Sequence, residues 1–194
     1  MQKWMFDEHY GLESAVLNGT KTMTRRNGMK PSEKYNSYVQ ECRRLGKVPM
    51  TLREYAISIC PVKVGDLVAV AQSYRNMGYD PMYCPIGLED GVGSSFGWNN
   101  KMYVRADLCK RHVEVTGVDY QMLWDITDED CMREGIIKIA TPHLPVKEHY
   151  TYINSGMISE TPKAAFAHLI RRLCGDSYWE SDPYNYVFSF ILKD

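Results

Sequence analysis

Residues 19 to 26, GTKTMTRR, combine within eight positions a glycine, a lysine, three threonines and two arginines. Gly19 ends a stretch with helical spacing and can adopt a positive φ, which lets the chain reverse after the helix. Thr24 and Arg26 then lie two residues apart, so in a strand they share one face. The stretch therefore predicts a helix, a tight turn and a strand, with Lys21 in the turn.

This stretch allows two interpretations. In the first, Lys21 only interacts with the carbonyl groups at the end of the helix, and the threonines belong to a half-exposed strand. In the second, the turn at Gly19 brings Lys21 onto the same side as Thr24, and the two side chains form a site. The position of Lys21 relative to the strand decides between them.

The stretch and its surroundings resemble the ASCH family, a branch of the PUA-like superfamily of small β-barrels linked to RNA. The family signature is a helix, then G-x-K-T-x-x-x-R, then a G-D turn into a strand, and its positions recur here as Gly19, Lys21, Thr22, Arg26 and Gly65-Asp66. Residues 101 to 136 and the closing segment 179 to 184 resemble the longer phage and gut-bacterial members. The resemblance implies a single α+β domain over residues 1–194, a PUA-like mixed β-barrel with flanking helices and helical insertions.

The resemblance also implies a chemistry. Some family members have a site attributed to amide hydrolysis of N4-acetylcytidine, built from a lysine, a threonine three residues on, and a glutamate on a later strand followed by Val-Thr. Lys21, Thr24 and Glu114 fall on those positions. A threonine nucleophile needs a base, and a lysine can serve when burial and a neighbouring arginine favour its neutral form. The expected roles are Thr24 as nucleophile, Lys21 as base and Glu114 as support, with Arg25 or Arg26 stabilising an oxyanion.

A binding module fits the same stretch, because lysine and arginine grip phosphate while indoles stack on unpaired bases. The side chains expected to bind a ligand are Thr22, Arg25, Arg26, Arg105, Trp98 and Trp179. The leading interpretation is therefore binding of RNA or of a modified nucleoside through a Lys/Thr/Arg cleft. Amide hydrolysis is the alternative, and a protein-interaction domain that uses the helical insertions is the second alternative.

Charge and cysteine usage narrow the possible partners. The chain has 23 basic and 24 acidic residues and a net charge of -1, so no global field draws it to a polyanion and any affinity for RNA must be local. The six cysteines form no C-x-x-C pair, which favours a reduced cytoplasm and argues against a zinc site. No metal or cofactor is expected. No apolar run approaches the ~20 residues that a membrane span needs.

Periodicity and capping signals predict the elements. We expect strands at 2–6, 67–71, 101–105, 111–120 and 184–192, and helices at 7–19, 31–45, 51–60, 127–135 and 161–175. Insertions are expected at about 27–63 and 75–100. The first should be a helical pair laid over the barrel, and the second a long loop whose aromatic side chains stack on a base or pack on the barrel.

Overall fold

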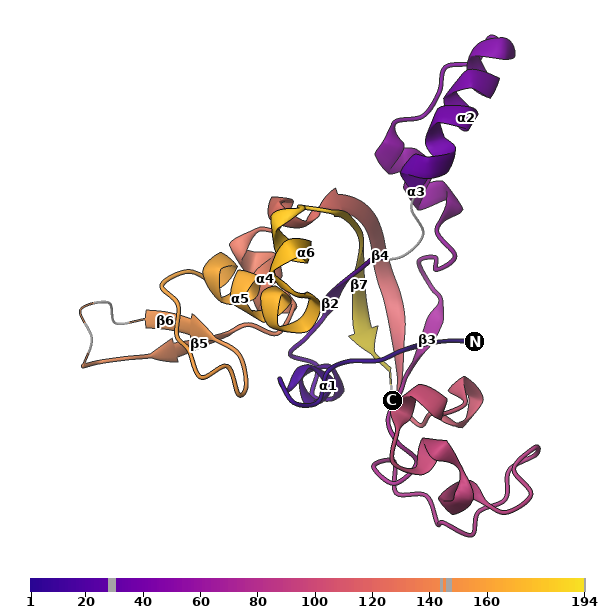
Figure 1. Ribbon diagram of the computed structural model, residues 1–194, viewed down its shortest axis with the longest axis vertical. Helices are drawn as coiled ribbons and strands as arrows, with labels where there is room; N and C mark the ends of the chain where they lie inside the picture. The colour runs from indigo at the N-terminus through magenta and orange to yellow at the C-terminus, as the bar shows by residue number, and fades with distance from the viewer. Residues whose placement is uncertain (28–30, 144, 146–147, 194) are drawn as a thin grey trace.

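The computed structural model describes residues 1–27, 31–143, 145 and 148–193, so residues 28–30 of the first predicted insertion lie outside the described residues. The helices are α1 (Leu12–Leu17), α2 (Pro31–Arg44), α3 (Leu52–Ile59), α4 (Asp128–Arg133), α5 (Pro162–Cys174) and α6 (Asp176–Glu180). The strands are β1 (Gln2–Trp4), β2 (Met23–Arg26), β3 (Leu67–Val70), β4 (His112–Met122), β5 (Ile137–Ala140), β6 (Glu148–Thr151) and β7 (Tyr184–Leu192). Figure 1 shows helices and a twisted sheet together, as expected of an α+β fold.

The main sheet has five strands in the order β1-β3-β4-β7-β2. Only β1 and β3 pair in parallel, and the other neighbours are antiparallel. The long β4–β7 ladder forms its centre, and the register shifts at a bulge between Val115 and Gly117. The remaining strands, β5 and β6, form a separate hairpin.

The expectation of a closed barrel is wrong. A barrel requires its first and last strands to pair, whereas β1 and β2 are the two edges of the sheet and do not pair within the described residues. Side chains occupy the space between these edges. The Arg26 guanidinium lies 4.9 Å from the centre of the Trp4 ring and 5.0 Å from that of Phe6.

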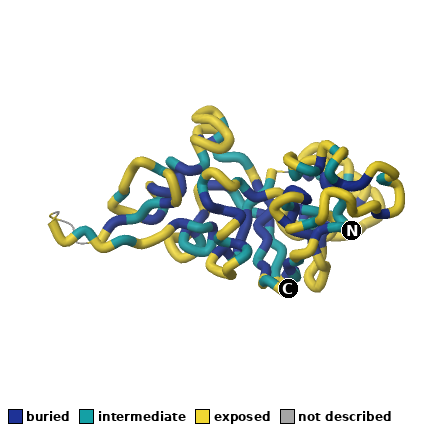
Figure 2. The backbone as a smooth tube through the Cα atoms, turned by 90° about the horizontal axis from the view of Figure 1, so that it is seen from below, coloured by how far each residue is buried: buried dark blue, intermediate teal, exposed yellow. Residues whose placement is uncertain are grey.

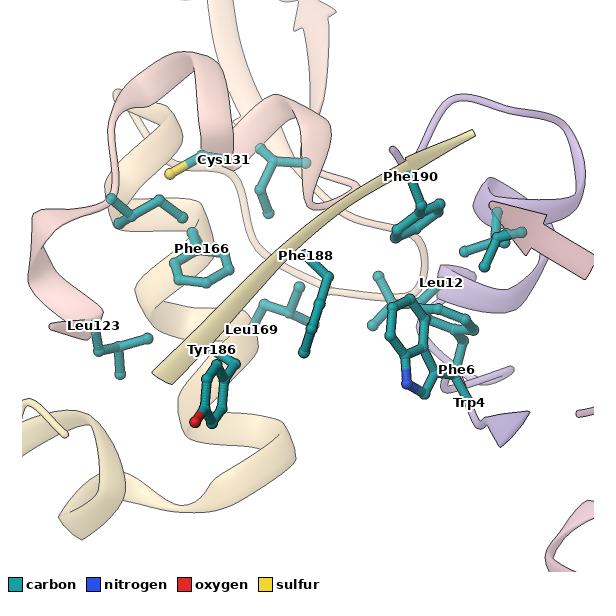
Figure 3. Packing of buried hydrophobic residues seen from close by; sticks show 14 of the residues in the cluster. Trp4, Phe6, Leu12, Leu123, Cys131, Phe166, Leu169, Tyr186, Phe188 and Phe190 are labelled. Carbon is teal, nitrogen blue, oxygen red and sulfur yellow. The ribbon is translucent and has the colours of Figure 1, made fainter. Parts of the chain in front are cut away.

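The core lies on one face of the sheet and under the C-terminal helices. On β7, Tyr186, Phe188 and Phe190 are buried, and Figure 3 shows their rings with Phe166 of α5 and with Trp4 of the N-terminal segment. The tube in Figure 2 is buried mainly in this central region and exposed at the projecting ends. The expected helix at 161–175 and the final strand both contribute buried residues to this core, as their apolar spacing predicted.

The helical insertion does not cover the sheet. Helices α2 and α3 form a hairpin that projects away from the sheet at the top of Figure 1. The rings of Tyr38 and Tyr55 stack 4.6 Å apart between the two helices. Only α3 reaches the sheet, where Arg53 donates two hydrogen bonds of 2.6 Å to Asp119 of β4. The stripe of α2 is used against α3, so no apolar face remains to pack on the sheet.

The expected strand at 101–105 is also wrong. Lys101–Tyr103 is one of several short 3-10 helices in this insertion. The Lys3 ammonium donates to the carbonyl groups of Met102 and Val104, and the Asn100 side chain accepts from the Met102 N–H. These bonds satisfy backbone groups that a partner strand would otherwise pair.

The second insertion has its own small core. Tyr74, Met77, Val92 and Val104 are buried together, and Trp98 packs against them. Sequence patterns did not predict the β5–β6 hairpin or α6. Within residues 1–27, 31–143, 145 and 148–193, no helix combines the length and apolar character that crossing a membrane requires.

Candidate functional site

The turn after α1 places Lys21 as the second interpretation requires. Gly19 has a φ of 76°, and the Lys21 N–H donates to the Ala15 carbonyl at 2.8 Å, so the turn folds back on the end of α1. The Thr22 N–H then donates to the Arg133 carbonyl at the end of α4. These bonds anchor the turn between two helices, and the Lys21 side chain is 2% exposed.

Glu134 is the partner of Lys21. The Lys21 ammonium donates to Glu134 Oε2 at 2.7 Å and to the Glu134 carbonyl at 2.6 Å. Burial is the main influence and lowers the pKa of Lys21, while the negative charge of Glu134 opposes it. Gly135, with a φ of 107°, ends α4 just after this residue. The pair is therefore a buried ion pair at the junction of two helix ends.

Two arginines on β2 extend the charged group in different directions. Arg25 donates to Glu134 Oε1 at 3.3 Å and to Asp130 Oδ2 at 3.4 Å. Arg26 lies against the aromatic rings at the other sheet edge, and its Nη2 donates to the Met5 carbonyl at 3.1 Å. Burial lowers the pKa of Arg26 to about 10. The Arg26 guanidinium is thus charged at neutral pH.

These residues line a cavity of about 370 Å³. Its lining residues are Met5, Phe6, Asp7, Leu12, Lys21, Thr24, Arg25, Arg26, Lys101, Glu134, Phe166, Leu169, Ile170, Leu173 and Cys174. The cationic side comes from β2 and the turn before it, and the apolar side comes from α5. Such a cavity has one surface for an apolar or planar group and another for polar groups.

Thr24 contributes a free hydroxyl to this cavity. The residue is 6% exposed, and its hydroxyl makes no hydrogen bond within the described part of the chain. The hydroxyl oxygen is accessible from the cavity, so a ligand or water there can supply its hydrogen-bond partner. Thr24 is therefore placed to hydrogen-bond to whatever occupies the cavity.

Glu114 does not join Lys21 and Thr24, contrary to the expectation. On β7, Phe188 pairs with Thr24 and Ile191 pairs with Glu114. Because Phe188 and Ile191 are three residues apart on one strand, their side chains lie on opposite faces of the sheet. The Glu114 carboxylate instead accepts from Lys193 Nζ at 2.6 Å.

The other expected binding residues lie outside this cavity. Thr22 accepts a hydrogen bond from Arg133, and Arg105 pairs with Asp107. Trp98 is packed in the core of the second insertion, and Trp179 is 9% exposed. Of the expected binding set, the cavity brings together only Arg25 and Arg26.

Sequence patterns missed Glu134 and the wall from α5. The helix dipole of α4 explains the acidic residues of its first turn only. Glu134 lies at the opposite end of α4, where a negative charge is unfavourable. A carboxylate at the C-terminal end of a helix indicates that Glu134 needs a cationic partner elsewhere in the chain.

No family model matches the sequence, and neither the curated proteins nor the solved structures contain a match.

Proposed function

We propose that the chain binds a ligand of nucleoside size, free or at the end of an RNA, in the cavity between β2 and α5. The observation that carries this proposal is the unbonded Thr24 hydroxyl beside three cationic side chains and opposite an apolar helix face. The resemblance of residues 19 to 26 to the ASCH family signature supports the same ligand class.

The dimensions of the cavity support a small ligand. A volume of about 370 Å³ lies near the lower end of the ~300–1,000 Å³ found for small-molecule sites. Leu169, Ile170 and Leu173 of α5 offer an apolar surface for one face of a base. Thr24 can then donate to, or accept from, a polar edge. A long RNA would have to present a single nucleotide to this cavity.

Amide hydrolysis is the second candidate, and the burial of Lys21 in the cavity that Thr24 also lines favours it. Burial lowers the pKa of Lys21, which favours the neutral amine that can take a proton from the Thr24 hydroxyl. The Thr24 oxygen would attack the acyl carbon of an N4-acyl cytidine, the amine would leave with a proton, and water would release the acid from threonine. In this reaction Glu134 replaces Glu114 as the residue that orients the lysine.

The projecting α2–α3 hairpin keeps a protein-interaction role as a further alternative. Leu45, Val48 and Met50 are exposed in the connection between its two helices. Binding of a nucleoside in the cavity does not depend on this surface.

Replacing Thr24 separates binding from hydrolysis. Thr24→Ala and the control Thr20→Ala, whose residue is exposed just before the turn, should be titrated with cytidine and N4-acetylcytidine by calorimetry. A binding role predicts that Thr24→Ala weakens affinity by about 0.5–1.5 kcal/mol, roughly 2- to 12-fold, while Thr20→Ala binds like wild type.

Chromatography of the same mixtures tests the second candidate. If Thr24 is the nucleophile, wild type releases acetate from N4-acetylcytidine and Thr24→Ala does not, although it stays folded. Absence of turnover by wild type would exclude this amidohydrolase activity. Absence of binding to any nucleoside or RNA end would refute the proposed ligand class.

A further inference from the structure

Three of the four cations that line the cavity have carboxylate partners. Lys21 pairs with Glu134, and Arg25 contacts both Glu134 and Asp130. At the rim, the Lys101 ammonium lies 2.6 Å from the carboxylate of Glu13. Arg26 is the exception, because it forms no ion pair with any residue in the described ranges.

The surroundings of Arg26 leave its charge uncompensated. Its guanidinium stacks near the rings of Trp4 and Phe6, which is a favourable but weak contact. Nη2 donates to the Met5 carbonyl, and the buried Nε has no hydrogen-bond partner. Nη1 makes no hydrogen bond within the described chain. The side chain thus has donors and a positive charge left for a ligand.

The other charged groups near the cavity do not leave a positive surplus. The carboxylates of Glu134, Asp130, Glu13 and Glu8 pair with the other three cations of the lining. The remaining acidic residue on the lining, Asp7, accepts from the Tyr10 N–H at 2.7 Å and forms no ion pair with a described cation. The case for an anion therefore rests on Arg26 itself, which is half-buried, has no ion-pair partner among the described residues and keeps donors that an anionic group can engage.

We propose that the ligand of this cavity is an anion, a nucleoside monophosphate, whose phosphate oxygens accept hydrogen bonds from Arg26 while its base lies against α5. This inference rests on the proposed function and specifies its ligand. The guanidinium presents parallel N–H donors that match an oxyanion, and the apolar wall accepts the uncharged part of the molecule. Inorganic phosphate alone can bind the guanidinium but has no uncharged part to lie against the apolar wall.

Calorimetric titration tests the proposal directly. The probes are the four ribonucleosides, their 5′- and 3′-monophosphates, and inorganic phosphate, each added to wild type, Arg26→Gln, Arg26→Lys and the control Arg44→Gln. Arg44 is an exposed arginine of α2 that pairs with Glu41, so its substitution removes the same charge far from the cavity. Hydrogen bonds to charged groups contribute about 1.5–3 kcal/mol, so at least one monophosphate should bind about 10- to 150-fold more tightly than its nucleoside.

The variants test whether Arg26 causes the tighter binding of the monophosphate. Arg26→Gln should remove the preference for the monophosphate over its nucleoside, whereas Arg44→Gln should keep that preference. Arg26→Lys should keep part of it, because the charge remains and the paired donors are lost. Thermal unfolding of each variant verifies the fold. If Arg26→Gln does not fold, the wild-type comparison and Arg26→Lys decide the question.

The outcomes separate this inference from the proposed function. Equal affinity for nucleoside and monophosphate, or a preference that persists in Arg26→Gln, overturns the role of Arg26 and leaves the nucleoside-sized ligand in place. Binding of inorganic phosphate as tight as that of the monophosphates shows a simple anion site and overturns the nucleotide. Binding of none of the probes overturns both proposals.

Discussion

Removing the carboxylate of Glu134 should destabilise the fold strongly at neutral pH. In Glu134→Gln, Lys21 loses the anion 2.7 Å from its ammonium, and Arg25 loses a contact of 3.3 Å. The Lys21 and Glu134 side chains are only 2% and 6% exposed, so water cannot replace the lost charge. Breaking such a buried pair costs about 3–5 kcal/mol. For a chain of this size that corresponds to a fall in Tm of about 6–20 °C.

The pH dependence of the variant follows from the pKa of Lys21. Because the folded-state pKa of Lys21 lies below its ordinary value, the unfolded chain binds more protons between the two pKa values, and stability rises with pH in that window. Glu134 opposes the lowering, so Glu134→Gln should lower the pKa further and extend the window toward neutral pH. The stability difference between wild type and variant should therefore narrow as pH rises from about 7 to about 9.5.

Urea unfolding at both pH values, followed by circular dichroism, measures this difference. Glu41→Gln is the matched control, because it also removes a carboxylate that pairs with a cation, but on the exposed surface of α2. Its Tm should equal that of wild type within error. A loss below about 1 kcal/mol in Glu134→Gln at pH 7 would show that water reaches the pair. A loss of the same size at both pH values would refute the coupling to the protonation of Lys21.

Two further predictions concern the packing around Gly97 and the buried hydroxyl of Tyr186. In Gly97→Ala the new Cβ would lie 2.6 Å from the Tyr74 ring, so thermal unfolding should show a loss of about 1–3 kcal/mol, against a smaller change in Gly117→Ala, where the nearest atom is 3.4 Å away. Equal losses in the two variants would contradict the steric argument. The Tyr186 hydroxyl donates to the buried Ala56 carbonyl at 2.9 Å, so Tyr186→Phe should lose about 1 kcal/mol. Because burial raises the pKa of Tyr186 from 10.0 to about 12, the free energy of unfolding of wild type should fall between these pH values. If it falls as steeply with pH in Tyr186→Phe, Tyr186 is not the cause.

Local signals in the sequence predicted many element boundaries correctly. The capping box between Thr51 and Glu54 starts α3, and the Thr161 hydroxyl caps α5. Gly19 follows α1 with a positive φ and leaves Lys21 in the turn after this helix, as predicted. These features depend on hydrogen bonds between residues three or four apart, so the residues that form them are adjacent in the sequence.

The same local signals failed where the partner of a residue lies far along the chain. Lys21 and Glu134 are separated by 113 residues, and no short spacing connects them. The choice of Glu134 over Glu114 depends on the strand register, which places Glu114 opposite Ile191 on the other face of the sheet. A shift of one residue in that register would place the Glu114 side chain on the opposite face of the sheet.

The sequence by itself therefore determined the α+β character, the helix caps and the turn that presents Lys21 and Thr24. Only the tertiary structure decided that the sheet stays open, that α2 and α3 project from it, and that Arg26 lies against aromatic rings with no ion-pair partner in the described part of the chain. The physical reason is the range of the interactions. Caps and turns are formed by neighbouring residues, whereas sheet closure and charge pairing depend on segments that meet only after the whole chain has folded.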